Sequence, residues 1–456
     1  MEQFEKKDEY LELLKNQIRC RKAKNMVAEE IDRHIEDQRA AFIEEGYEET
    51  DAMIKTLEQM GDPLEVGNQL NKIHKPRLEW HILIIVLELC SFGILAQLSI
   101  KASMGDDMLL YGLNIGKHLM FLVMGILVMT AFYYLDYSFI GKYPKAIWFI
   151  LLAGIILFTP FGREVNGQRI YLGPLPNLYS YGQLFVPVYG GILYANRKKG
   201  YWGIVFCLLL SLITGIIEMQ YITQSSVYLG LILSSLVMLT VAVMKDWFHV
   251  AKAKALMIIW GWIPVAFIAA LLLDISLFSQ YQLQRLRELV QIILNPGQYP
   301  KGYQMNMVRE ALSHTQLFGG TAEFTIGYLP GIQNDYVLTY VMGKWGIIAG
   351  VLLIVLFALF IGRMIYLSLH QKNTLGSFIG LGCSLVFGVQ GGIYILANLG
   401  IQLVAQVNLP FVSYGGSGLL VNFVILGVML SVFRNTNIIK EVPYKSKYVI
   451  RVEKVE

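Results

Sequence analysis

The stretch Asn408-Leu-Pro-Phe-Val-Ser-Tyr-Gly-Gly-Ser-Gly418 lies between two apolar segments near the C-terminus. Pro410 fixes one backbone angle and removes a hydrogen-bond donor. The glycines allow unusual dihedral angles and let another group approach the backbone closely. At membrane depth, irregular backbone is tolerated only when it is buried in protein or lines a wet cavity. The stretch therefore indicates a functional site, whose kind depends on what surrounds it.

The composition around this stretch is that of a membrane protein. Of 456 residues, 55% are hydrophobic and 16% are charged, and the mean hydropathy is +0.49. Soluble domains usually carry about 25% charged residues. Several apolar runs reach the roughly 20 residues that span a bilayer. We therefore predict an all-α, polytopic membrane protein rather than a soluble protein with buried helices.

Ten apolar segments are predicted to cross the membrane. They lie at about 80–100, 118–135, 145–160, 178–195, 201–219, 226–244, 254–277, 336–366, 376–399 and 416–434. The predicted membrane domain thus covers residues 80–435. Its longest connection, residues 278–335, includes an amphipathic segment, 282–293, that is suited to the membrane surface.

Basic residues orient the predicted spans. Alternate connections carry Lys142 and Lys145; Arg197, Lys198 and Lys199; Lys245, Lys252 and Lys254; and Arg363 and Lys372. The tail, residues 436–456, is also basic. The positive-inside rule makes these segments cytoplasmic. Both termini are then expected in the cytoplasm, with the opening stretch and the connection 278–335 outside.

Residues 1–76 differ from the rest because they are strongly charged. Apolar residues at helical spacing form three stripes. They are Tyr10, Leu11, Leu13, Leu14 and Ile18, then Val27, Ile31 and Ile35, and then Ala52, Ile54, Leu57 and Met60. Met60-Gly-Asp-Pro63 predicts the end of one helix and the start of another. Nothing here has a catalytic pattern. We expect a small cytosolic helical domain that binds an unidentified partner or stabilises the protein.

The sequence lacks the patterns that are typical of several function classes. The four cysteines are scattered, with no CxxC pair and no His/Cys cluster, so neither a zinc site nor a disulfide framework is indicated. No P-loop, nucleophile elbow or metalloprotease motif occurs. The first apolar run begins only near Trp80, so no signal peptide is expected. The net charge of +4 is small, and we expect no nucleic-acid partner.

Asp335 is the leading candidate for a catalytic residue. It follows Tyr328-Leu-Pro-Gly-Ile-Gln-Asn334 at the point where the long outer connection enters the eighth span. Partial burial at this boundary would raise the carboxyl pKa and make the side chain a better base. The alternative is that Asp335 caps the following helix, a role that Asn334 could also take.

Three cationic residues could serve an anionic ligand. Lys344 lies in the predicted eighth span, where a charge needs a cavity or a partner such as Glu88 or Asp274. A structural ion pair and a substrate contact both explain it. Arg163 and Arg169 lie in an outer loop. They would suit a diphosphate, which arginine binds in bidentate fashion, or they lie in a solvated loop or contact lipid headgroups.

The motifs resemble the SEDS family, which includes FtsW, RodA and SpoVE. Leu409-Pro-Phe-Val-Ser-Tyr-Gly-Gly-Ser-Gly418 is similar to the family's hallmark motif. Asn166-Gly-Gln-Arg169 resembles an outer-loop segment of the family, and Gly302-Tyr-Gln304 a motif that precedes the glycines of the long loop. Leu329-Pro330, Asp335 and Gly346 resemble the segment that enters the next span. The family's ten spans, with both ends inside, match the predicted topology.

This resemblance implies a peptidoglycan glycosyltransferase of the bacterial cytoplasmic membrane. Such proteins polymerise lipid II, a sugar–peptide on undecaprenyl diphosphate, at the outer face, generally with a class B penicillin-binding protein. Asp335 would act as general base or as a ligand of Mg²⁺ or Mn²⁺. The substrate-binding residues implied or expected are Arg163, Arg169, Gln304, Lys344, Ser413, Tyr414, Gly415, Gly416 and Ser417.

The chain departs from the family at several charged positions. Gly343-Lys344 stands where the family usually has two glutamates. Ser180-Tyr-Gly-Gln183 replaces a QPSE-like segment, and Val186 replaces a lysine. Two alternatives therefore stay open. One is a flippase for lipid II or a related polyprenyl-linked precursor. The other is a catalytically weakened scaffold that regulates a transpeptidase.

The N-terminal segment resembles a second family, the HAAS-type helical domain. The similar motifs are Glu29-Glu-Ile-Asp-Arg-His-Ile-Glu36, Glu45-Gly-Tyr-Glu-Glu49, Glu58-Gln-Met-Gly-Asp-Pro63 and Ile73-His-Lys-Pro76. In Gram-positive bacteria this domain accompanies signalling and membrane proteins. The resemblance implies a helical domain without catalytic chemistry.

Overall fold

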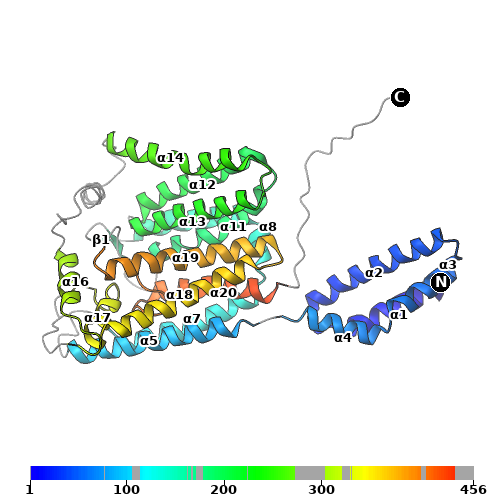
Figure 1. Ribbon diagram of the computed structural model, residues 1–456, viewed down its shortest axis with the longest axis horizontal. Coiled ribbons are helices and arrows are strands. Elements are labelled where there is room, and N and C mark those ends of the chain that lie inside the picture. The colour runs from blue at the N-terminus through cyan, green and yellow to red at the C-terminus, as the bar shows by residue number, and fades with distance from the viewer. Residues whose placement is uncertain are drawn as a thin grey trace. The chain divides into compact units, whose positions relative to one another are not determined.

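The computed structural model describes residues 2–76, 78–104, 113–161, 163–165, 168–170, 178–222, 224–272, 303–320, 329, 331–401 and 407–436. The described chain divides into two compact units, one within Met1–Leu78 and one spanning Glu79–Phe433 (Figure 1). The predicted surface segment 282–293 and most of the predicted tail, residues 437–456, lie outside the described residues.

Four helices build the N-terminal unit: α1 (Glu2–Gln17), α2 (Arg21–Glu44), α3 (Glu49–Met60) and α4 (Pro63–Ile73). Gly61 ends α3 with φ of 80°, and the Asp62 side chain accepts the backbone N–H of Leu64 at the start of α4. The predicted helix stop and restart is therefore confirmed. The core that these helices share is apolar, with Leu14 and Ile35 fully buried.

Two residues of the predicted stripes are not in this core. Leu13 is 41% exposed and Ile54 is 44% exposed, so their assignment to the buried stripes was wrong. Thr56 is buried instead, and its hydroxyl donates to the carbonyl of Ala52 at 2.7 Å. A hydroxyl that bonds its own helix backbone can replace an apolar side chain in the core.

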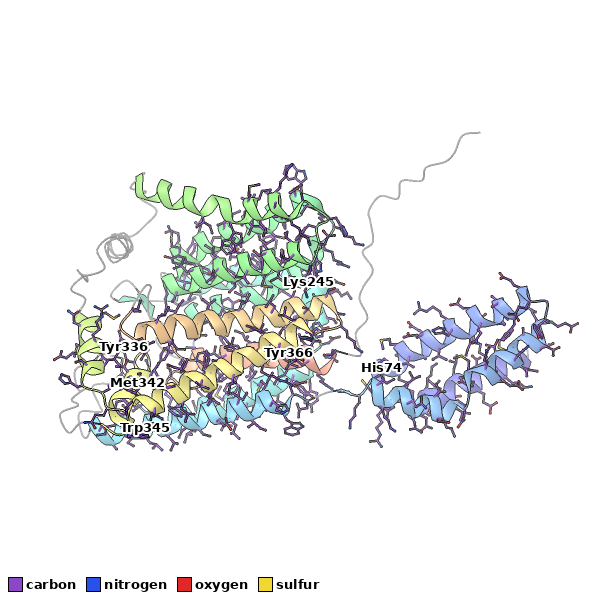
Figure 2. The ribbon with its side chains drawn as sticks, in the orientation of Figure 1. His74, Lys245, Tyr336, Met342, Trp345 and Tyr366 are labelled. Atoms are coloured by element: carbon purple, nitrogen blue, oxygen red, sulfur yellow. The ribbon has the colours of Figure 1, made fainter. Side chains whose placement is uncertain are left out.

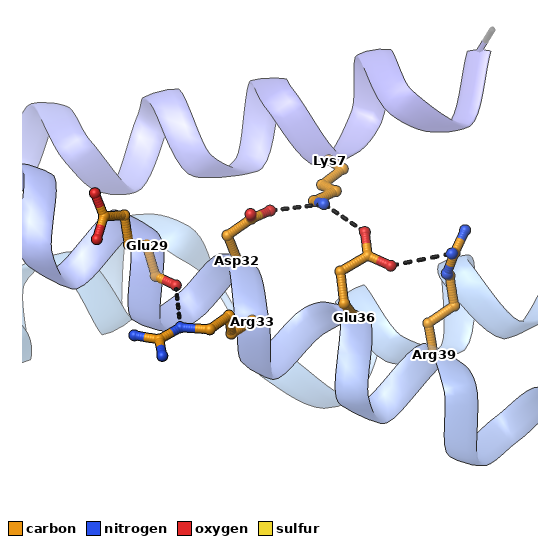
Figure 3. Close-up of polar contacts among 6 residues, drawn as sticks. All are labelled: Lys7, Glu29, Asp32, Arg33, Glu36 and Arg39. Carbon is orange, nitrogen blue, oxygen red and sulfur yellow. Dashed lines mark hydrogen bonds and ion pairs between the residues drawn. The ribbon is translucent and has the colours of Figure 1, made fainter. Parts of the chain in front are cut away.

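Charged side chains tie α1 to α2. Lys7 lies 2.6 Å from Asp32 and 2.5 Å from Glu36, and Arg39 lies 3.0 Å from the other oxygen of Glu36 (Figure 3). The Lys7 side chain is mostly buried, so its charge requires such partners. These contacts are structural.

Ten helices of the larger unit correspond one by one to the predicted spans. They are α5 (Trp80–Met104), α7 (Ile115–Tyr134), α9 (Pro144–Phe158), α11 (Phe185–Asn196), α12 (Gly200–Tyr221), α13 (Ser225–Met244), α14 (Lys252–Leu272), α18 (Ile347–Leu369), α19 (Thr374–Asn398) and α20 (Gly416–Arg434). Within the described residues, eight helices, all of these except α11 and α14, are long and apolar enough to cross a membrane. The prediction of a helical, multi-pass membrane protein is confirmed.

Shorter elements connect these helices. They are α8 (Ser138–Lys142), η2 (Thr159–Phe161), β1 (Arg163–Val165), β2 (Gln168–Ile170), α10 (Leu178–Gly182), α16 (Tyr303–Ser313) and α17 (Val337–Trp345). In Figure 1, α19 runs beside α18 and alongside α11 and α13. Figure 2 shows Tyr336 and Trp345 at one end of this bundle and Lys245 and Tyr366 at the other.

Glycine permits the close packing of α19 on α11. A Cβ atom at Gly382 would lie 3.0 Å from the carbonyl oxygen of Val186, and one at Gly190 would lie 3.0 Å from the carbonyl of Phe378. Small residues at such crossings let helix backbones approach closely inside membranes.

The predicted eighth span, 336–366, is not one helix. It breaks at Gly346, where φ is 103°, into α17 and α18. Part of the long connection that precedes this span binds the break through backbone hydrogen bonds. Gly319 N–H donates to the Trp345 carbonyl at 3.0 Å, and Ile347 N–H donates to the Gln316 carbonyl at 2.9 Å. The prediction of a continuous helix was wrong because the apolar pattern continues across a glycine that takes a left-handed conformation.

Candidate functional site

Asp335 ends a tight turn that directly precedes α17. Its backbone N–H donates to the Gly331 carbonyl at 2.7 Å. Its side chain is partly buried, and among the described residues its carboxylate has no hydrogen-bond or ion-pair partner. Burial raises the pKa of this carboxyl to about 7. A carboxyl with this pKa is suited to exchange protons near neutral pH.

Gly331 makes room for this carboxylate. Its φ is 77°, a left-handed conformation, and a Cβ atom there would lie 2.9 Å from Oδ2 of Asp335. Any side chain at position 331 would be strained in its backbone and would crowd the carboxylate.

The helix-cap alternative for Asp335 does not hold. Tyr336 is the N-cap position of α17, and no side chain at the start of this helix caps its own backbone. The caps come from α19, through Tyr394 and Asn398. The Asp335 side chain therefore does not cap the N-terminus of α17.

The opening stretch holds the Asp335 turn in place. The Gln333 carbonyl accepts the backbone N–H of Tyr414 at 2.9 Å and the side-chain amide of Gln97 on α5, also at 2.9 Å. Both Gln97 and Gln333 are buried. The motif thus positions the carboxylate by a backbone hydrogen bond, without supplying an acid or a base itself.

The interior of the motif is fixed by aromatic packing. Phe411 has φ of 67°, an unusual conformation for a bulky residue. It is 1% exposed and contacts the rings of Phe360, Phe387 and Phe423. A strained conformation of this kind persists only where its surroundings fix it, and this buried cluster does so.

The predicted substrate-binding residues of the motif have different surroundings. Ser413 is 4% exposed, and its hydroxyl accepts the Leu409 N–H at 2.9 Å. Tyr414 is partly exposed, stacks on the His118 ring at 5.5 Å and accepts the Asn114 N–H at 3.3 Å. Ser413 therefore stabilises the loop itself.

Gly415, Gly416 and Ser417 are partly exposed, and Gly416 begins α20. Position 416 has no space for a side chain, because a Cβ atom there would lie 2.5 Å from the Phe121 ring. These three positions form the accessible part of the motif.

Lys344 lies apart from Asp335. It is an exposed residue in the last turn of α17, and nine residues of helix correspond to about 13 Å. No ion pair joins it to a described carboxylate, Glu88 included, and Asp274 lies outside the described residues. Lys344 lies on α17, which precedes the candidate span Ile347–Leu369. A cation in the last turn of a helix interacts favourably with the negative end of the helix dipole.

Arg163 and Arg169 belong to an antiparallel strand pair that the sequence did not predict. Arg163 pairs with Ile170, and Arg169 pairs with Glu164. Paired positions share one face of a ribbon, and successive positions alternate between faces. Positions 163 and 169 therefore lie on opposite faces. Gln304 lies in the first turn of α16. The side chains of these three residues are outside what the structure describes.

Two buried polar residues on α19 were missed, although their pattern was visible. Tyr394 is 1% exposed and Asn398 is fully buried. They lie four residues apart near the end of a mostly apolar span, so they share one face of the helix. That spacing is the signal that could have identified them.

A small cavity adjoins the motif. It has a volume of about 30 Å³ and lies between α10, α11, α13 and α19, with Gln183, Ser226, Ser234 and Gln390 among its lining. This volume suits roughly two water molecules. Gln390 also donates to the Asn408 carbonyl at 2.8 Å, so a residue of the cavity wall is hydrogen-bonded to the motif.

Glu218 on α12 lies close to this cavity and was also missed. It is fully buried, and neither carboxylate oxygen has a hydrogen-bond partner in the described structure. A Cβ atom on Gly182, a residue of the cavity wall, would lie 2.9 Å from one of these oxygens.

Comparison with known proteins identifies the family. The family profile FtsW/RodA/SpoVE, described as "Cell cycle protein", matches residues 80–438. A probable peptidoglycan glycosyltransferase FtsW of Coxiella burnetii is 26% identical over 382 residues, which cover 78% of this chain and 96% of that protein.

Solved structures share the fold. A chain from a study of how a peptidoglycan synthase complex coordinates polymerization and crosslinking is similar with a TM-score of 0.60 and 22% identity, covering 79% of this chain and 98% of that chain. The rod shape determining protein RodA of Thermus thermophilus is similar with a TM-score of 0.53 and 18% identity, covering 78% of this chain and 97% of that chain. The family profile spans most of the chain and includes the motif that positions Asp335, so this protein belongs to the FtsW/RodA/SpoVE, or SEDS, family.

Proposed function

We propose that this protein is a peptidoglycan glycosyltransferase that polymerises lipid II into glycan strands in cell division, elongation or sporulation. Family membership and the name of the Coxiella burnetii relative support the proposal. The observation that carries it is the Asp335 carboxylate. It has no partner among the described residues, its pKa is raised to about 7, and the family motif holds its turn.

In the proposed reaction, Asp335 accepts the proton of the acceptor sugar hydroxyl. The hydroxyl oxygen attacks the anomeric carbon of the donor, and a new glycosidic bond forms. The bond from that carbon to the diphosphate oxygen breaks, and the polyprenyl diphosphate leaves with the electron pair. A base works best when its pKa lies near the working pH, as that of Asp335 does.

The leaving diphosphate needs positive charge or hydrogen-bond donors. We assign this role to one of the two arginines of the β1–β2 ribbon, since positions 163 and 169 lie on opposite faces of it. Gln304, Lys344 and the accessible positions Tyr414 to Ser417 complete the proposed substrate-binding set.

The proposed orientation has the Asp335 end of the bundle outside. Lys245, at the opposite end in Figure 2, belongs to the basic connections. The positive-inside rule then makes that end cytoplasmic, together with both termini. Lipid II polymerisation would occur at the outer face of the cytoplasmic membrane.

The alternative role proposed for Asp335 is that of a ligand of a divalent cation. In the described part of the chain, no group of three His, Cys, Asp or Glu side chains could hold a metal ion. Mg²⁺ commonly binds through one or two carboxylates together with substrate phosphates. One carboxylate fits that pattern, with the diphosphate supplying the other oxygens. Such an ion would neutralise charge on the leaving group.

Two protein partners belong to the proposal. A class B penicillin-binding protein would crosslink the strands, and the N-terminal helical unit, residues 1–76 with its HAAS-like motifs, would bind an unidentified cytosolic partner. The apolar core of that unit is built from its own residues, which supports an independently folded unit.

The proposal is tested with purified protein, its penicillin-binding partner and labelled lipid II in the presence of Mg²⁺ or Mn²⁺. Wild type should form glycan polymer. Asp335→Asn, which keeps the shape and removes the base, should lose roughly 100-fold or more of the rate, the usual contribution of general base catalysis. Asp246→Asn is the matched control, because Asp246 is exposed in the connection that follows Lys245.

Each alternative has its own outcome. Lipid II translocation in vesicles without polymer would support a flippase. Polymer from the partner alone, at a rate that this protein alters equally well as wild type and as Asp335→Asn, would support a scaffold. Equal polymer from this protein's own activity in both forms would exclude Asp335 as the base. Loss of polymer on chelation and its return with Mg²⁺ or Mn²⁺ would establish the cation.

A further inference from the structure

The N-terminus of α17 is capped by side chains of a different helix. The first turn of a helix leaves backbone N–H groups without partners inside the helix. In α17, Leu338 N–H donates to the Tyr394 hydroxyl at 3.1 Å, and Thr339 N–H donates to the Asn398 side-chain oxygen at 3.0 Å. Both acceptors lie on α19, one turn apart.

Asn398 also binds the Asp335 residue directly. Its side-chain amide donates to the Asp335 carbonyl at 2.8 Å and to the Tyr394 carbonyl at 3.0 Å. The Thr339 hydroxyl donates to the Asn398 side-chain oxygen at 2.9 Å. One buried amide thus joins the carbonyl before α17, the first turn of α17 and the body of α19.

These bonds are secluded from solvent. Asn398 and Thr339 are fully buried, and Tyr394 is 1% exposed. Water therefore cannot replace a bond that is removed, and the groups left without partners would destabilise the local arrangement. The turn would shift to find new partners, and the carboxylate would move with it.

We propose that Tyr394 and Asn398 are positioning residues that fix the Asp335 carboxylate for glycosyl transfer, an inference that rests on the proposed function. They do not touch the reacting atoms. They hold the backbone on the C-terminal side of Asp335, while Gln97 and Tyr414 hold it on the N-terminal side through Gln333. A base must lie within hydrogen-bond reach of the proton that it accepts, and displacement by 1 Å can lower a rate about 100-fold.

The test compares two variants with two matched controls in the full-length protein. Tyr394→Phe removes one hydroxyl and keeps the ring, and Asn398→Ala removes the amide. The controls are Tyr189→Phe, whose hydroxyl donates to the Cys207 carbonyl, and Asn422→Ala, a buried asparagine on α20. Each protein is assayed for kcat, KM for lipid II and thermal stability.

The positioning role predicts a specific pattern. Both α19 variants should lower kcat by roughly 10- to 100-fold with KM changed less than about twofold, because uniform binding is not affected. In an Asp335→Asn background, neither variant should lower the residual rate further, since residues that act as a unit are not additive. The controls should keep the wild-type kcat.

Other results would overturn the inference. Wild-type kcat in both variants would do so. A loss of kcat that the controls match, or that persists in the Asp335→Asn background, would also do so. Tyr394→Phe alone decides the matter if Asn398→Ala yields no folded protein. Failure of the proposed function itself looks different, because wild type would then form no polymer or Asp335→Asn would form as much as wild type.

Discussion

At the scale of single residues, Asp335 predicts how activity depends on pH. The base accepts a proton only when it is ionised, and burial raises its pKa to about 7. The rate of polymerisation should therefore rise with pH through about 7 and then level off. A pH profile of single-turnover polymerisation measures this. An ordinary carboxyl would give a rate that is already level at that pH.

The same shift predicts an opposite effect on stability. The folded-state pKa of about 7 is above the reference value of 3.8, so folding favours the protonated form. This stability contribution is complete below the reference pKa and is lost as pH rises through about 7. Thermal unfolding temperatures of wild type should fall over this window relative to Asp335→Asn. Asp246→Asn should retain the wild-type slope, and parallel curves for wild type and Asp335→Asn would contradict the shift.

At the scale of elements, Gly346 predicts how the break between α17 and α18 is maintained. A non-glycine residue in a left-handed conformation costs about 1–2 kcal/mol, and a Cβ atom there would also lie 2.6 Å from the Leu317 carbonyl oxygen. Gly346→Ala should lower the free energy of unfolding by at least that amount. Thermal unfolding of the purified protein in detergent measures the loss.

Gly362 on α18 provides the control for this prediction. A Cβ atom at Gly362 would meet nothing within 4 Å, and alanine favours helix over glycine by about 0.8–1.0 kcal/mol. Gly362→Ala should therefore keep or raise stability. An equal loss in both variants would mean that the left-handed conformation of Gly346 does not matter for the break.

At the scale of the whole molecule, the two compact units predict independent folding of the N-terminal unit. Its helices share an apolar core of their own, so a fragment of residues 1–78 should be helical and unfold cooperatively. Leu14→Ala should destabilise it by about 2–5 kcal/mol, as buried leucines do, because Leu14 is fully buried. Circular dichroism during urea unfolding measures this change.

The neighbouring residue Leu13 provides the control for this prediction. Leu13 is 41% exposed, and exposed substitutions usually change stability by less than about 0.5 kcal/mol. Leu13→Ala should therefore unfold like wild type. Comparable losses at both positions, or a fragment without a cooperative transition, would show that the unit depends on the rest of the chain.

The sequence predicted the parts of this protein that depend on local or repetitive physical rules. Apolar runs of bilayer length predicted the helices, because a span must satisfy its own backbone hydrogen bonds. Glycine and proline predicted the boundary at Met60 to Pro63 in the N-terminal unit. The family motif and Asp335 were also identified from sequence, and so was the expectation of a partly buried carboxylate.

What the sequence left open depends on contacts between segments that are distant in the chain. Helical spacing could not decide between Leu13 and Leu14, since adjacent residues differ by 100° around a helix and the partner helix selects the buried side. The break at Gly346 and the caps on α17 come from residues of other segments. The sequence by itself determined a multi-pass helical protein with the family motif near its C-terminal span. Only the tertiary structure decided that this motif, α5 and α19 hold Asp335 from separate sides, because buried polar groups must find partners wherever the fold supplies them.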